Sequence, residues 1–196
     1  MESRRPTEPM LVNWQAIEDR LFALSDEAIA RFGKEHPEEV CSFFAYDVDL
    51  PFFLVSFDTP ANAVHVAQRT EQEAIARRAK MLTLPTAWQG AEQFSMQPPV
   101  LDYSYSTGYF AHHAFVNVKI DELEDLAFEE EYPPREEWAD DYAEGNTRIV
   151  LWRVIERLIE RDAFRRLRLA APCRLGYQMH DHALTVLRIL NWPHPQ

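Results

Sequence analysis

Two adjacent runs of strand-forming residues, joined at a proline, constrain the fold more than any other feature of this sequence. Residues 39–49 read EVCSFFAYDVD and residues 51–58 read PFFLVSFD, and both runs are rich in Val, Phe and Tyr. Pro51 can open a strand but cannot lie inside a central one, because it has no backbone N–H to donate. The sequence therefore predicts a hairpin, or a tight connection between two strands, at Leu50-Pro51.

The segment before this pair has the apolar spacing of an amphipathic helix. Residues that recur three and four positions apart lie on one helical face. In this segment they are Trp14, Ile17, Leu21, Leu24 and Ala28. Gly33 is predicted to end the helix, since glycine is favoured just after a helical C-terminus. Ser25-Asp26 could restart the helix, which would place a kink there.

A second helix is predicted after the strand pair. Thr59 is its expected N-cap, and Pro60 fits its first turn, where a missing N–H costs nothing. The helix is expected to run to about Leu82. Its apolar residues are expected to face the core: Val64, Ala67, Ile75, Ala79 and Leu82.

The strongest helical pattern is RIVLWRVIERLIERDAF, residues 148–164, with Asn146 or Thr147 as the predicted N-cap. Its apolar stripe consists of Leu151, Val154, Ile155 and Leu158. Charged residues three positions apart are expected to pair along its wet face: Arg153 with Glu156, and Arg157 with Glu160.

The remaining regular segments complete an α+β pattern. Residues 109–120, YFAHHAFVNVKI, have strand-forming composition, although a short helix also fits. Residues 173–190 predict two short strands around a turn at His180–His182. We therefore expect an α+β fold, a mainly antiparallel sheet of about five strands with three main helices packed on it. Its core should include Trp14, Leu21, Phe44, Phe53, Leu151, Ile155 and Leu158.

Length and composition narrow the class of protein. The chain has 196 residues, of which 46% are apolar, so it can bury a sizeable core. Residues 1–9 are expected to form a flexible N-terminal arm and residues 10–196 a single domain. Cys41 and Cys173 lie in apolar runs and are expected to be small core residues in a reducing compartment. No secretory signal or membrane span is recognisable, so a cytoplasmic location is expected.

The charge of the chain is concentrated in one place. Residues 121–144, DELEDLAFEEEYPPREEWADDYAE, carry twelve acids and one base, while the rest of the chain carries twenty acids and nineteen bases. This acidic segment therefore holds −11 of the total −12. Such a field repels nucleic acid and anionic membranes and attracts cationic partners. A solvated loop and helix face would have the same composition.

Aromatic residues lie among these carboxylates, which is typical of a specific protein interface. Rings provide buried anchors, while charges steer and select the partner. The residues expected to contact a basic partner are Glu129, Glu130, Glu131, Tyr132, Glu136, Glu137, Trp138, Asp140, Asp141 and Tyr142.

Four of the seven histidines lie in two short stretches, FAHHAF at 110–115 and QMHDH at 178–182. On a strand, His180 and His182 would share a face about 7 Å apart and could hold a metal with His112 or His113 as third ligand. The alternative is a polar turn between two strands. Because no third ligand stands at a recognised spacing, the sequence predicts a turn, no metal site and no cofactor.

Other candidates for chemistry are weaker. Asp47 and Asp49 could hold Mg²⁺, but turn chemistry before Pro51 explains them better. The five glycines are never clustered, so no phosphate-binding loop is present. Cys41 or Cys173 would need a nearby base to act as a nucleophile. The aromatic residues Tyr103, Tyr105, Tyr109 and Phe110 could line a small-molecule pocket, but without a basic patch they do not indicate nucleic-acid binding.

The order of several short motifs resembles a bacterial domain-of-unknown-function family whose members are similar in layout to immunity proteins of polymorphic toxin systems, including the SUKH-type superfamily. In chain order the motifs are NWQAIEDRLFAL, YDVD, SFDTPANAV, LWRVIERLIERDAF, CRLGYQMHDHALTVLRIL and NWP. The chain lacks the glycine-containing early motif of SUKH proteins. The resemblance implies a non-enzymatic protein that neutralises a toxin domain. The expected function is therefore an immunity-type antitoxin that binds a basic effector. A metal-dependent enzyme using His180 and His182, and a small-molecule-binding domain, are the alternatives.

Overall fold

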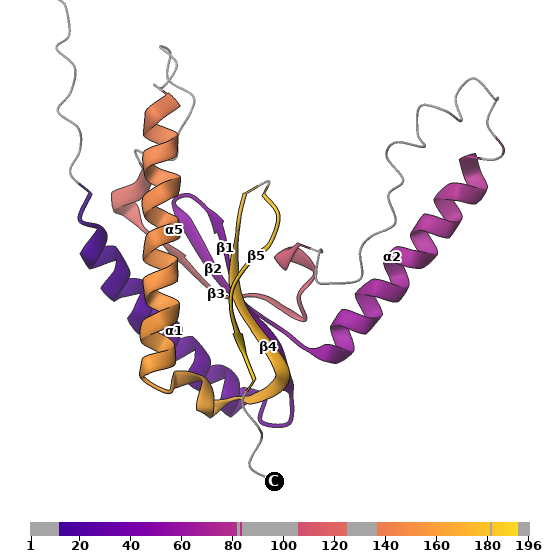
Figure 1. Cartoon of the computed structure of the whole chain (residues 1–196), viewed down its shortest axis with the longest axis horizontal. Coiled ribbons are helices and arrows are strands. Elements are labelled where there is room, and N and C mark those ends of the chain that lie inside the picture. Colours follow the sequence, from indigo (N-terminus) through magenta and orange to yellow (C-terminus); the bar gives the residue numbers. More distant parts are fainter. Residues whose placement is uncertain (1–11, 82, 84–105, 125–136, 181, 192–196) are drawn as a thin grey trace, which may run out of the picture.

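The computed structural model describes residues 12–81, 83, 106–124, 137–180 and 182–191, and for residues 81 and 137–141 it describes the backbone alone. The described residues form an α+β fold, as predicted, with one five-stranded sheet in the order β3-β2-β1-β4-β5 (Figure 1). The helices are α1 (Trp14–Glu35), α2 (Pro60–Met81) and α5 (Glu137–Glu160). The strands are β1 (Val40–Asp49), β2 (Phe52–Asp58), β3 (His112–Lys119), β4 (Arg168–Met179) and β5 (Thr185–Leu190).

The sheet contains the predicted hairpin and one parallel pair. β1 and β2 are antiparallel with Asp49 opposite Phe52, so the chain turns at Leu50-Pro51 as expected. β2 pairs with β3 and β4 with β5 in the same sense, whereas β1 and β4 run parallel. Residues 109–120 thus contain a strand rather than a helix. The parallel pair is possible because α5 lies between β3 and β4 in the chain and carries it back across the sheet.

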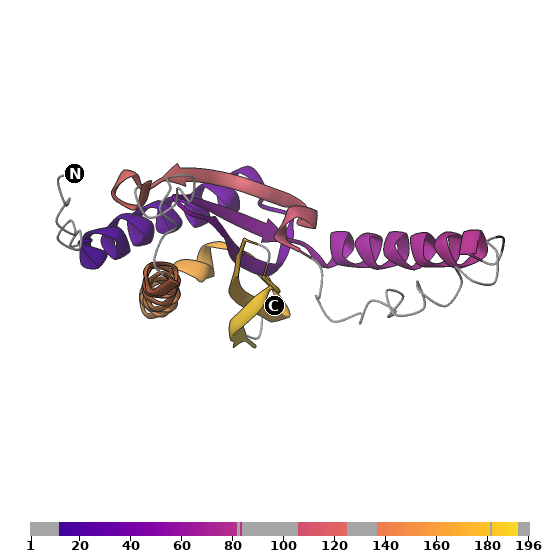
Figure 2. The ribbon, with the colours of Figure 1, turned by 90° about the horizontal axis from the view of Figure 1, so that it is seen from above.

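Helices α1 and α5 lie side by side and cover one face of the sheet (Figures 1 and 2). Alternate residues of β1, Phe44, Tyr46 and Val48, point toward this layer because side chains alternate along a strand. The predicted stripe of α5 is buried there: Leu151, Val154, Ile155 and Leu158. Of the predicted core residues, Trp14 alone is half-buried, at the edge of the core.

The start of α5 and the end of α1 differ from the prediction. α5 begins at Glu137, nine residues before Asn146, so neither Asn146 nor Thr147 is its N-cap. α1 runs without a break through Ser25-Asp26 and past Gly33 to Glu35. Gly33 has another role, since a Cβ there would lie 2.3 Å from the Arg166 carbonyl oxygen. Gly33 therefore permits close contact between α1 and the short 3-10 helix Ala163–Arg166 (η4) rather than ending the helix.

Arg153 and Arg157 of α5 pair across the helix layer and not, as predicted, along their own helix. Arg157 lies 2.7 Å from Glu18 and 2.8 Å from Asp19, both on α1, and Arg153 also faces Glu18. Glu18 is buried, so its carboxylate needs these partners to offset the loss of solvent. Glu156 instead pairs with Arg188 of β5. Sequence spacing predicts which side chains are neighbours on one helix. It does not predict ion pairs with a second helix that packs alongside.

Helix α2 has the predicted bounds but not the predicted packing. Thr59 caps it by accepting a hydrogen bond from the Asn62 backbone N–H at 3.2 Å. The helix then projects away from the sheet and from the other two helices (Figures 1 and 2). Val64 and Ile75 are 57% and 62% exposed, and among the described side chains of this helix Val66 alone is buried. None of the helices in the described part of the chain has the length and apolar character that a membrane span requires.

Candidate functional sites

Both described ends of the acidic segment lie against α1. Glu122, in the short 3-10 helix Asp121–Leu123 (η3), lies 3.8 Å from Arg20. At the other end Tyr142 accepts a hydrogen bond of 3.1 Å from the Trp14 indole N–H, and their rings meet edge to face. The segment is therefore held at both described ends by the first two turns of one helix.

The structure describes few of the residues predicted to bind a partner. Glu129, Glu130, Glu131, Tyr132 and Glu136 lie outside the described residues. The backbone of Glu137, Trp138, Asp140 and Asp141 forms the start of α5, and their side chains are not described. Tyr142 is 42% exposed, and its hydroxyl accepts the hydrogen bond from Trp14.

Some acids of the segment already have basic partners from the body of the protein. Lys119 at the end of β3 lies 2.7 Å from Glu124 and 3.6 Å from Asp121. The hydrogen bond that Lys119 donates to Glu124 is the main reason that the pKa of Lys119 is raised. At the far end Glu144 pairs with Arg148 one turn later in α5. These acids of the segment are therefore partly neutralised by bases of the described chain.

The histidines of the QMHDH motif lie at a turn, as predicted. β4 ends at Met179, and the His182 N–H donates to the Met179 carbonyl. His180 Nδ1 lies 4.0 Å from Asp49, whereas His182 Nδ1 lies 3.6 Å from Glu144. These two histidines face different carboxylates, so the strand geometry required for a shared metal is not formed.

Adjacent histidines of β3 face different neighbours, as expected for a strand. His113 contacts Asp47 at 3.2 Å, and Asp47 also accepts a 2.8 Å hydrogen bond from the Thr107 hydroxyl. Gln178 of β4 accepts a hydrogen bond from the Thr107 N–H. Asp47 thus ties the segment before β3 to the sheet, which is a structural role, and Asp49 ends β1 at the hairpin turn.

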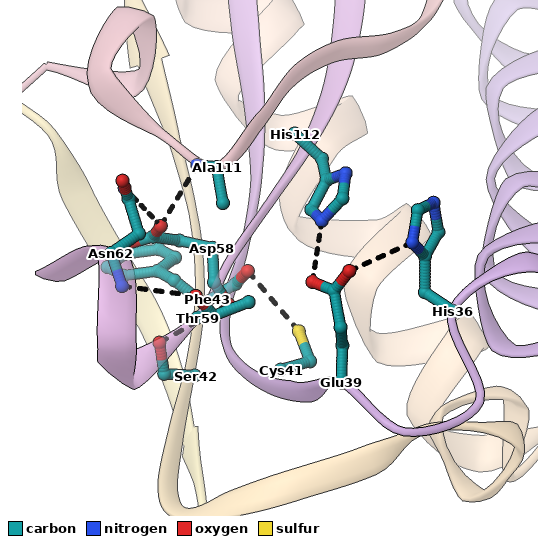
Figure 3. Close-up of polar contacts among 10 residues, drawn as sticks. All are labelled: His36, Glu39, Cys41, Ser42, Phe43, Asp58, Thr59, Asn62, Ala111 and His112. Carbon is teal, nitrogen blue, oxygen red and sulfur yellow. Dashed lines mark hydrogen bonds and ion pairs between the residues drawn. The ribbon is translucent and has the colours of Figure 1, made fainter.

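His112 meets a second histidine and a carboxylate from elsewhere in the chain (Figure 3). His36 Nδ1 lies 2.9 Å from Glu39 Oε1, and His112 Nε2 lies 2.7 Å from Glu39 Oε2. Glu39 thus bridges the two imidazoles. Within the part of the chain that the structure describes, this His36–Glu39–His112 cluster is the group of side chains with the donor atoms and spacing of a metal site.

Local structure explains why these three residues converge. His36 follows the last residue of α1, where its N–H donates to the Phe32 carbonyl, and a turn joins it to Glu39 through a hydrogen bond from the Glu39 N–H. Glu39 immediately precedes β1, and His112 begins β3 opposite Phe57 of β2. The cluster is therefore located where a helix ends and two strands of the sheet begin.

An aromatic frame holds the two imidazole rings. Phe32 of α1 packs against both, with ring centroids 4.8 Å from His36 and 4.9 Å from His112. Phe32 itself stacks on Phe57 of the sheet, which is fully buried. Phe115 closes another side of the frame. Packing on this scale fixes ring orientation before any ligand arrives.

The electrostatics of the cluster favour an ionised carboxylate. Partial burial acts to raise the pKa of Glu39, but the hydrogen bonds and charges of His112 and then of His36 outweigh it and lower that pKa below its usual value. An ionised carboxylate accepts hydrogen bonds and cannot donate them, so the imidazole nitrogens that face Glu39 carry protons. A metal ion would replace these protons at the same positions.

A cavity of about 280 Å³ lies next to this cluster. His36 and Glu39 form part of its wall, together with Phe32 and the bases Arg165, Arg166 and Arg168. Arg166 and Arg168 are already paired with Asp26 and Glu38. The cavity gives solvent and small molecules a route to the cluster.

The two cysteines are buried and free, as predicted. The neighbouring Cys173 thiol and then burial raise the pKa of Cys41 well above its usual value. A thiol is nucleophilic as the thiolate, so this environment argues against Cys41 as a nucleophile. Of the aromatic residues proposed to line a pocket, Phe110 packs on Phe43 in a small core and Tyr109 is exposed, while Tyr103 and Tyr105 lie outside the described residues.

Sequence reasoning named His112 as a possible ligand but missed His36 and Glu39. The one available signal was the spacing His-x-x-Glu at a predicted helix end, which a turn can bring together. His112 is 73 residues from Glu39, and their contact depends on the register of β3 against β2.

Comparison of the chain with protein-family models, with curated proteins and with solved structures gives no match.

Proposed function

We propose that this protein is a non-enzymatic binding protein, an immunity-type antitoxin that neutralises a basic toxin domain with its acidic segment. The observation that carries the proposal is the concentration of −11 of the net charge within residues 121–144. The order of short motifs described above supports the class of partner. The proposal includes no role for nucleic acid or for a membrane, since both are anionic.

The attachment of both described ends of the segment to α1 supports this proposal. Glu122 contacts Arg20 and Tyr142 contacts Trp14, so residues at opposite ends of the segment share one anchoring helix. The described ends of the segment therefore both lie at the N-terminal part of α1. A concentrated field of one sign raises the rate at which an oppositely charged protein docks.

Aromatic residues give the same surface its affinity. Charge at the rim of an interface mainly sets the association rate, whereas buried rings at its centre set the dissociation rate. Trp138, in the first turn of α5, is the proposed anchor. The exposed ring of Tyr142 extends the same surface one turn later.

The first experiment separates local charge from total charge. The partner is sought by affinity purification from the source cell and by co-expression with the neighbouring gene. One variant reverses four acids of the segment to Lys: Glu130, Glu131, Glu136 and Glu137. The matched control makes the same change at four exposed acids elsewhere: Glu27, Glu35, Glu71 and Glu73. Stopped-flow association is then measured at ionic strengths from about 0.01 M to about 0.15 M, over which the Debye length falls from ~30 Å to ~8 Å.

The segment variant should associate at least tenfold more slowly than wild type at low salt, and the control should lie much closer to wild type. Both should unfold at nearly the wild-type denaturant concentration, because exposed charges contribute little to stability. If the segment variant binds as fast as wild type, the segment is a solvated face and the proposal loses its physical support.

The second experiment tests the anchor. Trp138→Ala should raise the dissociation rate and leave the association rate nearly unchanged. Trp152→Ala is the matched control, since Trp152 lies on the same helix and is 44% exposed. Equal effects of the two substitutions would remove Trp138 from the interface.

A further inference from the structure

We propose that His36, Glu39 and His112 bind a divalent transition-metal ion, with Zn²⁺ as the preferred species. The site is independent of the acidic segment and of the proposed antitoxin function. It lies at the His36–Glu39–His112 cluster, which Figure 3 shows, at the end of α1. The cavity lies beside it. It also departs from the prediction of no metal site, which considered His180 and His182 with His112 or His113 as the third ligand.

The spacing of the donor atoms fits one ion. One atom from each residue can be chosen so that all three lie within 4.8 Å of one another. Ligands about 2.1 Å from a tetrahedral ion are separated by about 3.4 Å. Glu39 Oε1 lies 2.9 Å from His36 and Glu39 Oε2 lies 2.7 Å from His112, so both separations must lengthen slightly when an ion enters between the three side chains.

The donor types select the metal. Two imidazoles and one carboxylate favour Zn²⁺ and neighbouring transition ions, because Mg²⁺ and Ca²⁺ prefer sites built from oxygen alone. Structural zinc sites are closed by four protein ligands, whereas three ligands leave a position for water. The cavity that shares His36 and Glu39 provides access for that water.

The surroundings are those of a preorganised site. The side chains of His36, His112 and Glu39 are 27%, 19% and 38% exposed, so each is partly desolvated yet reachable. Phe32 and Phe115 restrict both rings. Ordinary surface histidines lose rotamer freedom when they bind an ion, and rings held in this way lose less.

The test uses the full-length protein and Zn²⁺ itself. Titration calorimetry of the metal-free wild type should give about one site per chain, with no competition from excess Mg²⁺. His112→Gln and Glu39→Gln should each weaken Zn²⁺ binding at least about tenfold, because even partners one step removed from a metal change affinity by about 10–100-fold. His113→Gln is the matched control, since it alters the adjacent histidine of the same strand, and it should bind as wild type does.

A second measurement needs no variant and so does not depend on their folding. In the ¹⁵N-labelled wild type, one equivalent of Zn²⁺ should shift the imidazole nitrogens of His36 and His112 and leave those of His113, His180 and His182 in place. Absence of saturable binding would overturn the proposal. So would shifts at His180 and His182, or an equal loss of affinity in His113→Gln and His112→Gln.

Discussion

Helices α5 and α2 are similar in length, 24 and 22 residues, and their sequences predict similar apolar faces, but one is embedded in the core and the other projects from it. α5 packs on the sheet and along α1, with Leu151, Val154 and Leu158 fully buried. α2 is joined to the body at its first turns, through Asn62, which donates to the Asp58 carboxylate at 2.7 Å and to the Tyr109 carbonyl at 2.8 Å. Beyond Thr70 it is exposed nearly throughout.

The difference shows what an apolar repeat can and cannot predict. The repeat reports which residues share a helical face, because the backbone has a fixed period. Burial of that face depends on a partner that another part of the chain must supply. α5 has α1 and β1 as partners, whereas the described residues supply no partner for Val64 and Ile75.

The largest expected effect on this contrast belongs to a truncation in α5. Leu158→Ala should lower the free energy of unfolding by about 2–5 kcal/mol, because it leaves a cavity in a fully buried layer. The measurement is equilibrium unfolding in urea with circular dichroism. A loss below about 0.5 kcal/mol, the range of ordinary surface changes, would show that this face of α5 is not packed as described.

Two glycines sharpen the comparison between close packing and open surface. Gly33→Ala should cost about 1–3 kcal/mol, since the new Cβ would meet the Arg166 carbonyl oxygen. Gly145→Ala within α5 should instead stabilise the protein by about 0.5–1 kcal/mol, because a Cβ there meets nothing within 4 Å and alanine is the better helix former. Thermal unfolding of the two variants should therefore shift in opposite directions. Equal shifts of the same sign would refute the close approach of α1 to η4.

Alkaline pH tests the bond that ties α1 to the sheet. The Tyr46 hydroxyl, fully buried, lies 2.6 Å from the Ser25 hydroxyl of α1. Burial raises the pKa of Tyr46 far above its usual value near 10, and the hydrogen bond with Ser25 lowers it only in part. The folded state therefore keeps a proton that the unfolded chain loses, so this contribution is complete below about pH 10 and is lost as pH rises beyond it.

Tyr46→Phe removes that titration. At neutral pH it should cost about 0.5–1.5 kcal/mol for the lost hydrogen bond. Above about pH 10 the wild type should lose stability more steeply than the variant, so the difference between them should shrink. Urea unfolding across this pH range measures it, and two parallel pH profiles would contradict the burial of the hydroxyl.

The smallest expected effect belongs to α2. Ile75→Ala should change the free energy of unfolding by less than about 0.5 kcal/mol, because the side chain is 62% exposed and alanine favours the helix. The same urea experiment applies. A cost comparable with that of Leu158→Ala would mean that Ile75 is covered in solution and that the contrast between α2 and α5 is smaller than the structure indicates.

Local features of the fold could be predicted from the sequence, and long-range ones could not. The hairpin at Pro51, the cap at Thr59 and the stripe of α5 each depend on neighbouring residues, and all three are confirmed. The parallel pairing of β1 with β4 joins residues more than 120 positions apart. The start of α5 was missed because Gly145 and Asn146 have low helix propensity, which tertiary packing can override.

The candidate metal cluster has the same limitation. His112 was singled out because it lies in a histidine-rich stretch, but its partners depend on strand register and on where α1 ends. The QMHDH motif, whose spacing could suit a pair of metal ligands on a strand, forms the turn that the sequence predicts. Histidines that are close in sequence are therefore a weaker indication of a metal site than side chains that three separate elements bring together.

The central position of β1 also bears on how the chain folds during synthesis. β1 is bounded by β2 on one side and by β4 on the other, and β4 is made only after residue 168. Until then one edge of β1, the central strand, has no hydrogen-bonding neighbour, and its ring-bearing face lacks α5. A long loop must close before that edge is satisfied, which slows the final step and leaves the nascent chain open to strand addition by other molecules. The risk of self-association is therefore greatest before the last third of the chain has left the ribosome.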